Sequence, residues 1–501
     1  MKRRILKIVL VSSEVTPFAK TGGLADVCGA LPVALEQLGH EVTVIMPAFR
    51  QALECGQPRR RTGYRLTVPL KSQLLRAEVW QSSLPTSGVA VLMVDYPPYF
   101  DRNGLYRDEH HEYPDNCERF VFFCRAVLQL IAQLPDTLDI LHCNDWQTGL
   151  IPAYLEIELR SRTKFKSIAS LLTIHNLAYQ GLFWRHDMPV TGLDWRFFNW
   201  RQMEYYGKLN LLKTGIVFAN GINTVSPTYA AEIQTPLMGC GLDGVLRERP
   251  QGIQGILNGI DHHVWEPTTD HYLACNYDYN SWRHGKAIGK AALQESLNLP
   301  LLPDILLVAI IGRLADQKGW DMLAPVIERW AETRDVQWVI LGTGERHYER
   351  AIQRLGATFP DRVAVRLEFS EVLAHRIEAG ADLFLMPSHY EPCGLNQLYS
   401  LRYGTVPLVR ETGGLADTVV DATTEAVQTR RATGFSFHDA NSQALEETLQ
   451  RASKMFESQP DVWQQLVVTG MKQDWSWTQS ARSYGQLYNQ LTSAKRRDAM
   501  A

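Results

Sequence analysis

The chain has 501 residues, of which 45% are hydrophobic and 21% are charged, and its formal net charge is −3 at pH 7. This composition is typical of globular proteins and excludes extended disorder. The length predicts two or three domains, because single hydrophobic cores rarely grow this large. The near-neutral charge leaves no surplus of positive charge for nucleic acid or an anionic membrane, so neither is expected as a partner.

The cysteines and the N-terminal residues give information about the cellular compartment of the protein. The eight cysteines include no CxxC pair, so we expect reduced thiols rather than disulfides. The basic residues 2–4 and the apolar run after them resemble a signal peptide only in part, because Lys7 interrupts the run and no cleavage site follows. No apolar run approaches the roughly 18–20 residues of a membrane span. These features favour a cytoplasmic protein; a plastid stromal protein without its transit peptide would share them.

The first half of the chain alternates between strand and helix patterns. The β-branched run 5–13 predicts a buried strand, the apolar spacing from Leu24 to Leu38 predicts a helix that Gly39 ends, and 41–47 predicts a second strand. This βαβ unit implies a parallel sheet. The alternation continues with strands expected at 89–94, 138–142, 168–175 and 222–226, and a helix at 118–133.

The second half repeats this alternation after an irregular segment. Residues 261–283 are rich in His, Tyr, Trp, Asn and Pro, and we place the crossing between domains near them. Strands are then expected at 305–312, 336–342, 363–367, 382–387 and 405–409, and helices at 320–332, 345–355, 371–379, after 391 and at 476–493. The pattern predicts two doubly wound, Rossmann-like α/β domains, 1–262 and 263–475, followed by a C-terminal helix, 476–501, that packs back on the first. Ligands of such folds bind at the carboxyl ends of the strands.

The sequence TGGLAD occurs at 21–26 and again at 412–417, each time where a strand-like run passes into a helix. A shared way of starting a helix is one explanation. Two helix N-termini that attract an anion are the other. Lys20 adds positive charge before the first copy, and its paired glycines let the backbone approach a ligand closely. The loop matches neither GxGxxG nor GxxxxGK[ST], which argues against dinucleotide and ATPase sites.

Two cations and a carboxylate follow strands of the second half. Arg313 and Lys318 could neutralise the charge on a departing diphosphate, although a solvated charged loop is the alternative interpretation. Glu391 could accept hydrogen bonds from sugar hydroxyls while the N–H groups of Gly394 and Leu395 face the ligand. Helix capping is the alternative for this acidic residue.

Polar residues also end two strands of the first half. His142 and Asp145 follow one strand, and His175 ends the next. A lone histidine is more often a structural residue than a ligand. Because no HExxH motif or clustered His/Asp spacing accompanies these residues, no metal site is expected.

Together these motifs resemble the bacterial glycogen synthase and plant starch synthase family. The motifs that carry the resemblance lie at 20–26, 173–181, 258–261, 313–319, 391–395 and 412–417, and the likeness extends to 474–477. The resemblance implies a GT-B type fold with two facing domains and an inter-domain cleft. It also implies transfer of glucose from ADP-glucose to the non-reducing 4-hydroxyl of an α-1,4-glucan, namely glycogen, starch or a maltooligosaccharide, with retention of configuration and without metal or other cofactor.

The resemblance further assigns individual residues. The implied catalytic residues are Lys20, His175, Arg313, Lys318 and Glu391. The implied substrate-binding residues are Gly22, Gly23, Asp26, Asp145, Asn258, Phe369, Cys393, Gly394, Leu395, Thr412, Gly413 and Gly414. Phe369 stands where such enzymes often stack a tyrosine on adenine. Tyr399 stands where many retaining transferases have a second glutamate, so Glu391 has no carboxylate partner there.

Alternative functions would place different requirements on the chain. A sucrose-forming or trehalose-forming glucosyltransferase of the same fold would differ in its acceptor. A phosphorylase is disfavoured because nothing resembles a pyridoxal-phosphate lysine neighbourhood. A non-catalytic glucan-binding paralogue would be expected to lack some of the four residues Lys20, Arg313, Lys318 and Glu391, and all four are present.

Overall fold

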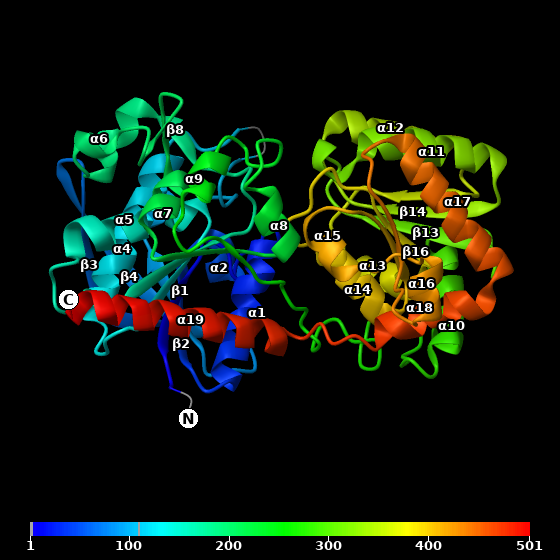
Figure 1. Cartoon of the computed structure of the whole chain (residues 1–501), viewed down its shortest axis with the longest axis horizontal. Helices are drawn as coiled ribbons and strands as arrows, with labels where there is room; N and C mark the ends of the chain where they lie inside the picture. The colour runs from blue at the N-terminus through cyan, green and yellow to red at the C-terminus, as the bar shows by residue number, and fades with distance from the viewer. Residues whose placement is uncertain (1–3, 109–110, 501) are drawn as a thin grey trace. The chain divides into compact units, whose positions relative to one another are not determined.

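The computed structural model describes residues 4–108 and 111–500, with the side chains of the last helix as far as Arg497, and divides the chain into two compact α/β units (Figure 1). The N-terminal unit comprises Met1–Gly259 together with Trp477–Ala501, and the C-terminal unit comprises Ile260–Ser476. Each unit is built on a sheet whose central strands are parallel, which confirms the predicted fold class. The signal-peptide interpretation falls partly on residues 1–3, which lie outside the described part.

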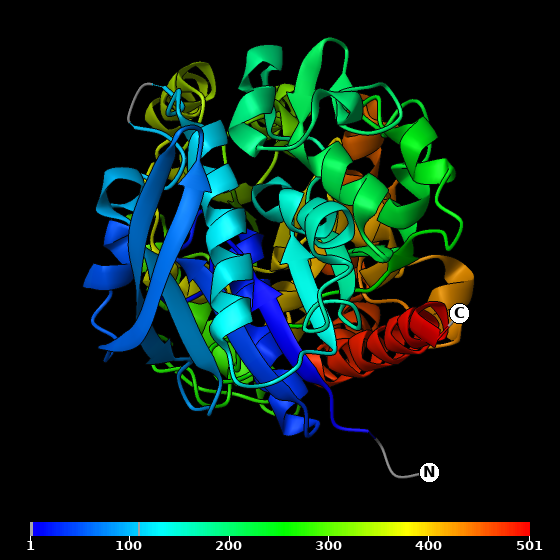
Figure 2. The ribbon, with the colours of Figure 1, turned by 90° about the vertical axis from the view of Figure 1, so that its left-hand side faces the viewer.

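The N-terminal unit contains a nine-stranded sheet in the order β12-β11-β7-β6-β1-β2-β5-β4-β3. Its parallel strands are β1 (Lys7–Val11), β2 (Glu41–Pro47), β5 (Ala90–Asp95), β6 (Ile140–Asn144), β7 (Ala169–Ile174), β11 (Gly221–Thr224) and β12 (Gln254–Gly255). An antiparallel hairpin, β3 (Arg60–Leu70) and β4 (Gln73–Ser83), closes one edge. Figure 2 shows this hairpin in blue with α4 (Asn116–Gln133) in cyan beside it, where the Gln129 side chain bonds to the backbone of Thr67.

The helices of this unit follow its strands. They are α1 (Gly23–Gln37), α2 (Arg50–Glu54), α3 (Pro97–Phe100), α4, α5 (Leu150–Tyr154), α6 (Met188–Thr191), α7 (Leu211–Phe218), α8 (Pro227–Glu232) and α9 (Asp243–Arg247). Gly39, with φ +90°, follows α1 where the sequence predicted the helix to end. A small antiparallel sheet of β8 (Leu182–Trp184), β10 (Lys208–Asn210) and β9 (Glu204–Tyr205) lies between α5 and α7 in the sequence.

The last helix, α19 (Trp477–Met500), belongs to the N-terminal unit and contacts α1 and β7. Its Tyr488 hydroxyl lies 2.9 Å from Nδ1 of the buried His142 on β6, and the Ser480 hydroxyl donates to the Leu257 carbonyl at 2.6 Å. His142 therefore links the sheet to this helix.

The C-terminal unit has a six-stranded parallel sheet in the order β15-β14-β13-β16-β17-β18. The strands are β13 (Leu306–Ile311), β14 (Val336–Leu341), β15 (Val363–Arg366), β16 (Leu383–Met386), β17 (Val406–Arg410) and β18 (Phe435–Phe437). The helices are α10 (Trp282–Ser296), α11 (Trp320–Thr333), α12 (Arg346–Thr358), α13 (Glu371–Gly380), α14 (Asn396–Tyr403), α15 (Gly413–Thr418), α16 (Thr424–Gln428), α17 (Ser442–Ser458) and α18 (Pro460–Met471).

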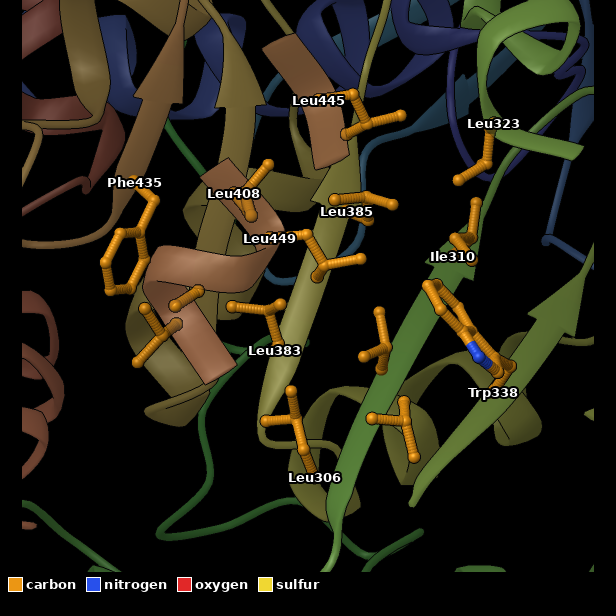
Figure 3. Close-up of a cluster of buried hydrophobic side chains, with 14 of the residues drawn as sticks. Leu306, Ile310, Leu323, Trp338, Leu383, Leu385, Leu408, Phe435, Leu445 and Leu449 are labelled. Atoms are coloured by element: carbon orange, nitrogen blue, oxygen red, sulfur yellow. The ribbon is translucent and has the colours of Figure 1, made fainter. Parts of the chain in front are cut away.

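Apolar side chains cover both faces of this sheet, as expected for parallel strands between helices. Figure 3 shows one face, where Leu306, Ile310 and Trp338 pack with Leu383 and residues of α17. A second cluster covers the other face. No helix in the described part of the chain is long and apolar enough to cross a membrane.

Candidate active site

In the N-terminal unit, a buried carboxylate shapes the loop between β1 and α1. The Glu14 carboxylate accepts hydrogen bonds from the backbone N–H groups of Thr21 and Gly22, from the Thr21 hydroxyl at 2.7 Å and from the Tyr106 hydroxyl at 2.7 Å. Two amides of the glycine loop therefore face Glu14. Sequence reasoning missed this residue; the only signal was an acidic side chain directly after a buried strand.

The same loop brings together Lys20, Gly22, Gly23 and Asp26. The Lys20 Nζ lies 2.6 Å from Asp26 Oδ1, and both side chains are partly exposed. Exposed pairs of this kind contribute little to stability, so Lys20 can exchange its partner at low cost. A Cβ placed on Gly22 would meet no atom within 4 Å, so the space beside this glycine is open.

Asp145 and His175 lie together where β6 and β7 end. The His175 backbone N–H donates to Asp145 Oδ1 at 2.7 Å, and burial raises the pKa of Asp145 to about 7. His175 Nε2 lies 2.9 Å from the Asn144 side-chain oxygen, whose amide nitrogen donates to the Val11 carbonyl. Nε2 is therefore the donor, and Nδ1 carries the lone pair. Burial lowers the pKa of His175 to about 3, so the ring is neutral at pH 7.

We expect replacement of Asp145 by asparagine to change the dependence of stability on pH. The folded-state pKa of Asp145, about 7, lies above its ordinary value of 3.8, so this group's stabilising contribution is full below pH 3.8 and is lost as the pH rises to about 7. Asparagine keeps an oxygen for the His175 N–H but does not titrate. The urea midpoint of Asp145→Asn should therefore rise relative to wild type across this range. The same substitution at the exposed Asp304 is the control and should follow wild type. Parallel profiles for wild type and Asp145→Asn would contradict the assignment.

Asn258 lies at the end of the N-terminal unit. Its side chain is 6% exposed, and its Oδ1 is buried without a hydrogen-bond partner among the described residues. Buried polar atoms are rarely left unpaired, so an acceptor of this kind is a candidate ligand contact.

In the C-terminal unit, the structure brings Arg313, Lys318 and Glu391 to neighbouring loops at the strand ends. The Lys318 Nζ lies 2.6 Å from Glu391 Oε2, and the Ser388 hydroxyl donates to the same oxygen at 3.0 Å. Gln317 connects the loops, because it accepts from Arg313 at 3.1 Å and donates to the Tyr390 carbonyl at 3.2 Å. Glu391 is buried and Lys318 is partly buried.

The second TGGLAD copy packs against the Glu391 loop. A Cβ on Gly413, where φ is +46°, would lie 2.0 Å from the Glu391 carbonyl oxygen, and one on Gly414 would lie 2.1 Å from the Cys393 carbonyl oxygen. The Gly414 N–H donates to the Glu391 carbonyl at 3.1 Å. In contrast to Gly22, these glycines are required by contacts within the protein. Thr412 is the buried residue that precedes them at the start of α15.

The helix expected after 391 is observed as α14, which begins five residues later. The helix α14 begins at Asn396, so Glu391, Cys393 and Gly394 lie in the loop before it, and Gly394 has φ +71°. Leu395 is the N-cap residue of α14. The buried guanidinium of Arg410, at the end of β17, donates to the Ser388 and His389 carbonyls and so holds this loop. Sequence reasoning missed Ser388 and Arg410.

Two further positions bear on ligands. Phe369 lies between β15 and α13 and is 84% exposed.

Among the described residues, one group has the spacing of metal ligands, formed by the exposed side chains of Asp316, Glu345 and His347. Asp316 accepts a hydrogen bond from the Tyr348 hydroxyl at 2.6 Å.

Comparison with known proteins gives consistent matches over the whole chain. Residues 7–248 match the family described as the starch synthase catalytic domain, and residues 298–462 match glycosyl transferases group 1. The chain is 48% identical to the glycogen synthase of Rhodopirellula baltica, over 98% of this chain and 99% of the relative, and 46% identical to that of Syntrophotalea carbinolica, over 96% and 98%.

Solved structures extend this similarity to the fold. The catalytic domain of starch synthase IV from Arabidopsis thaliana, bound to ADP and acarbose, matches with a TM-score of 0.90 and 32% identity over 98% of this chain and 100% of that one. Sucrose-phosphate synthase from Thermosynechococcus elongatus matches with a TM-score of 0.59 and 18% identity over 98% and 100%, which shows a shared fold.

Proposed function

This chain belongs to the glycogen synthase and starch synthase family of glucosyltransferases, and we propose that its donor is ADP-glucose and its acceptor the non-reducing 4-hydroxyl of an α-1,4-glucan. The configuration of the transferred glucose is retained, no metal takes part, and the enzyme works in the cytoplasm. The observation that carries the proposal is the group of Arg313, Lys318 and Glu391 at the strand ends of the C-terminal unit, where a buried carboxylate suited to sugar hydroxyls lies near two cations suited to a diphosphate. The ADP bound to the similar starch synthase supports the choice of nucleotide.

The contacts of Glu391 suggest how the donor sugar is held. Its Oε2 accepts from both Lys318 and Ser388, which leaves Oε1 for a glucosyl hydroxyl. In the N-terminal unit, His175, neutral and with its lone pair on Nδ1, can accept a hydrogen bond from a glucosyl hydroxyl. The open acceptor Oδ1 of Asn258 serves the same purpose. In these assignments, the hydroxyls of the sugar donate hydrogen bonds to protein acceptors that are neutral or anionic.

Catalysis then depends on stabilising the leaving group. As the diphosphate departs, the sugar ring gains positive charge and the phosphate oxygens gain negative charge. Arg313 and Lys318 neutralise the phosphate oxygens in the C-terminal unit. In the N-terminal unit, Lys20 can exchange Asp26 for an anionic ligand group. Departure and attack occur on one face of the sugar, and a phosphate oxygen takes the acceptor proton. Phe369 stacks on the adenine, and Asp145 lies near the acceptor.

The direct test is incorporation of labelled glucose into glycogen from ADP-glucose and, separately, from UDP-glucose, each with and without EDTA. We expect ADP-glucose to be the better donor and EDTA to have no effect. Preference for UDP-glucose, dependence on a divalent metal, or release of sucrose or trehalose instead of extended glucan would each contradict one part of the proposal.

Alanine at the equivalent glycines of the two TGGLAD copies should have different consequences. Gly22→Ala meets no atom within 4 Å in the free protein, so stability should stay within about 0.5 kcal/mol of wild type while kcat/KM falls at least about tenfold. Gly413→Ala meets the Glu391 carbonyl and a left-handed backbone, so stability should fall by about 1–3 kcal/mol. Urea unfolding and glucose incorporation measure the two effects. Equal stability losses in both variants would refute the distinction between ligand-facing and internally packed glycines.

A further inference from the structure

Exposed aromatic side chains gather on one stretch of the N-terminal unit that the proposed reaction does not use. Trp184, Trp195 and Trp200 are 67%, 46% and 66% exposed, and they are all of the tryptophans among the exposed large hydrophobic residues of the described chain. Tyr206, 83% exposed, lies in the same stretch. Such grouping is unusual for a free surface and typical of an interaction site.

The small sheet β8-β10-β9 orders part of this stretch. Lys208 on the central strand pairs with Trp184 on one side and Tyr205 on the other, so these three residues form one cross-strand row. Because neighbouring residues of a strand point to opposite faces, the next row, which contains Phe183 and Leu209, points the other way. Leu209 is fully buried, so the Trp184–Lys208–Tyr205 row faces outward. We call this row together with Tyr206 the aromatic sheet face.

The aromatic sheet face is held in a fixed geometry. The Phe183 ring on the inner row lies 5.7 Å from the ring of Trp146, the residue that follows Asp145. The Tyr205 hydroxyl donates to the Cys240 carbonyl at 2.6 Å, and its ring meets that of Tyr206 edge-on at 4.8 Å. Tyr206 and Gly207 have φ +47° and +77°, as in the tight two-residue turns that join antiparallel strands. The side chains of the aromatic sheet face are therefore largely ordered before a ligand binds.

The side chains of this face suit a carbohydrate better than a protein. Aromatic rings pack against the apolar C–H face of a pyranose, while the hydroxyls at the sugar rim need polar partners. Lys208 lies between the rings, and the His186 ring lies 4.2 Å from that of Trp184. Lysine is depleted at the cores of protein interfaces, which argues against a partner protein. Strands two apart are separated by about 10 Å, so the outer rings of this row can contact two sugars of one glucan chain that are separated by a further sugar.

The chain path connects this face to the proposed sugar site. His175 directly follows β7, and the loop that continues from it contains Tyr179, 51% exposed, before β8 begins. On this basis we propose that the aromatic sheet face binds the glucan acceptor at sugars remote from the reacting end and so favours long polymers over short oligosaccharides. This inference rests on the proposed function, because it takes the acceptor to be a glucan.

The test is the double variant Trp184→Ala/Tyr206→Ala in the full-length protein. At saturating ADP-glucose, we expect the KM for glycogen to rise about tenfold, while kcat, the KM for ADP-glucose and the KM for maltotriose stay within twofold of wild type. Tyr279→Ala, which removes an exposed aromatic ring of the C-terminal unit, is the matched control and should leave all four constants unchanged. An unchanged glycogen KM in the double variant would overturn the proposal.

Binding without catalysis separates this inference from the proposed function. Wild-type protein should co-sediment with glycogen in the absence of any donor, and the double variant should do so at least about fivefold less. If wild type fails to transfer glucose but this difference remains, the donor assignment fails and the binding face stands. If the double variant instead loses binding to vesicles of anionic lipid, or changes oligomeric state, while glycogen binding is unchanged, the face serves a membrane or a protein and the proposal is wrong.

Discussion

Replacing Glu391 by glutamine is expected to lower kcat/KM for ADP-glucose by about 100-fold to 1,000-fold, the usual effect of removing one pre-organised polar group from an active site. Glutamine preserves the shape of the side chain, which is buried between Lys318 and Ser388, but removes the charge that holds Lys318 at 2.6 Å. The sugar hydroxyl would also lose its strongest acceptor. Initial rates of glucose incorporation into glycogen measure the effect.

A carboxylate elsewhere in the same unit provides the control. Glu446 accepts hydrogen bonds from Arg329 and from the Trp330 ring, and it lies outside the proposed site. Glu446→Gln should keep wild-type rates. If Glu391→Gln retains more than a third of wild-type activity while folded, Glu391 has no part in sugar binding.

Replacing Lys318 by alanine should lower kcat/KM at least as much, by about 1,000-fold, because the variant loses both the cation proposed to bind phosphate and the side chain that contacts Glu391. Lys318→Arg should recover only part of the rate, since a planar guanidinium does not reproduce a compact ammonium charge. The double variant Lys318→Ala/Glu391→Gln should lose less than the product of the single losses, because the two side chains are in contact.

Lys290 separates catalytic from structural effects of removing a lysine. It is a buried lysine of α10 that pairs with Asp382 at 2.7 Å and donates to the Pro303 and Ile305 carbonyls. Lys290→Ala should therefore lower the urea midpoint without a comparable change in kcat/KM of the folded enzyme. If Lys318→Ala lowers stability but leaves kcat/KM unchanged, Lys318 has the structural role expected of Lys290, and its catalytic role is contradicted.

The regular α/β core could be predicted from the sequence because both signals it uses are local. The strand 41–47 was predicted and is observed as β2 (Glu41–Pro47), and the helix predicted at 320–332 is observed as α11 (Trp320–Thr333). In the sequence, buried parallel strands appear as short runs of β-branched residues, and the helices between them have apolar residues every three to four positions. Elements that were not predicted include the β3–β4 hairpin, whose strands alternate exposed and buried residues, and the sheet β8-β10-β9, whose strands have two or three residues. The helices α10, α17 and α18 and the strand β18 were not predicted either.

The candidate site was predicted only where its residues belong to recognisable sequence motifs. Lys20, Arg313, Lys318 and Glu391 were found through their motifs, and the last three meet in the structure. Glu14 and Arg410 were not found, because their importance lies in contacts with backbone groups that fold back over the loop, and no sequence pattern records such contacts. The different packing of the two TGGLAD copies could not be predicted either, because the two copies have identical sequences and differ only in the residues that contact them.

The position of α19 has a consequence for how the protein is made. The first unit is completed by a helix that leaves the ribosome only after all of Ile260–Ser476 has been synthesised. At about 5–20 residues per second, the sheet strands that receive Tyr484 and Tyr488 stay uncovered for on the order of 10–40 s. During that interval the nascent first unit presents an apolar surface that chaperones can recognise, and the second unit can finish folding before the first.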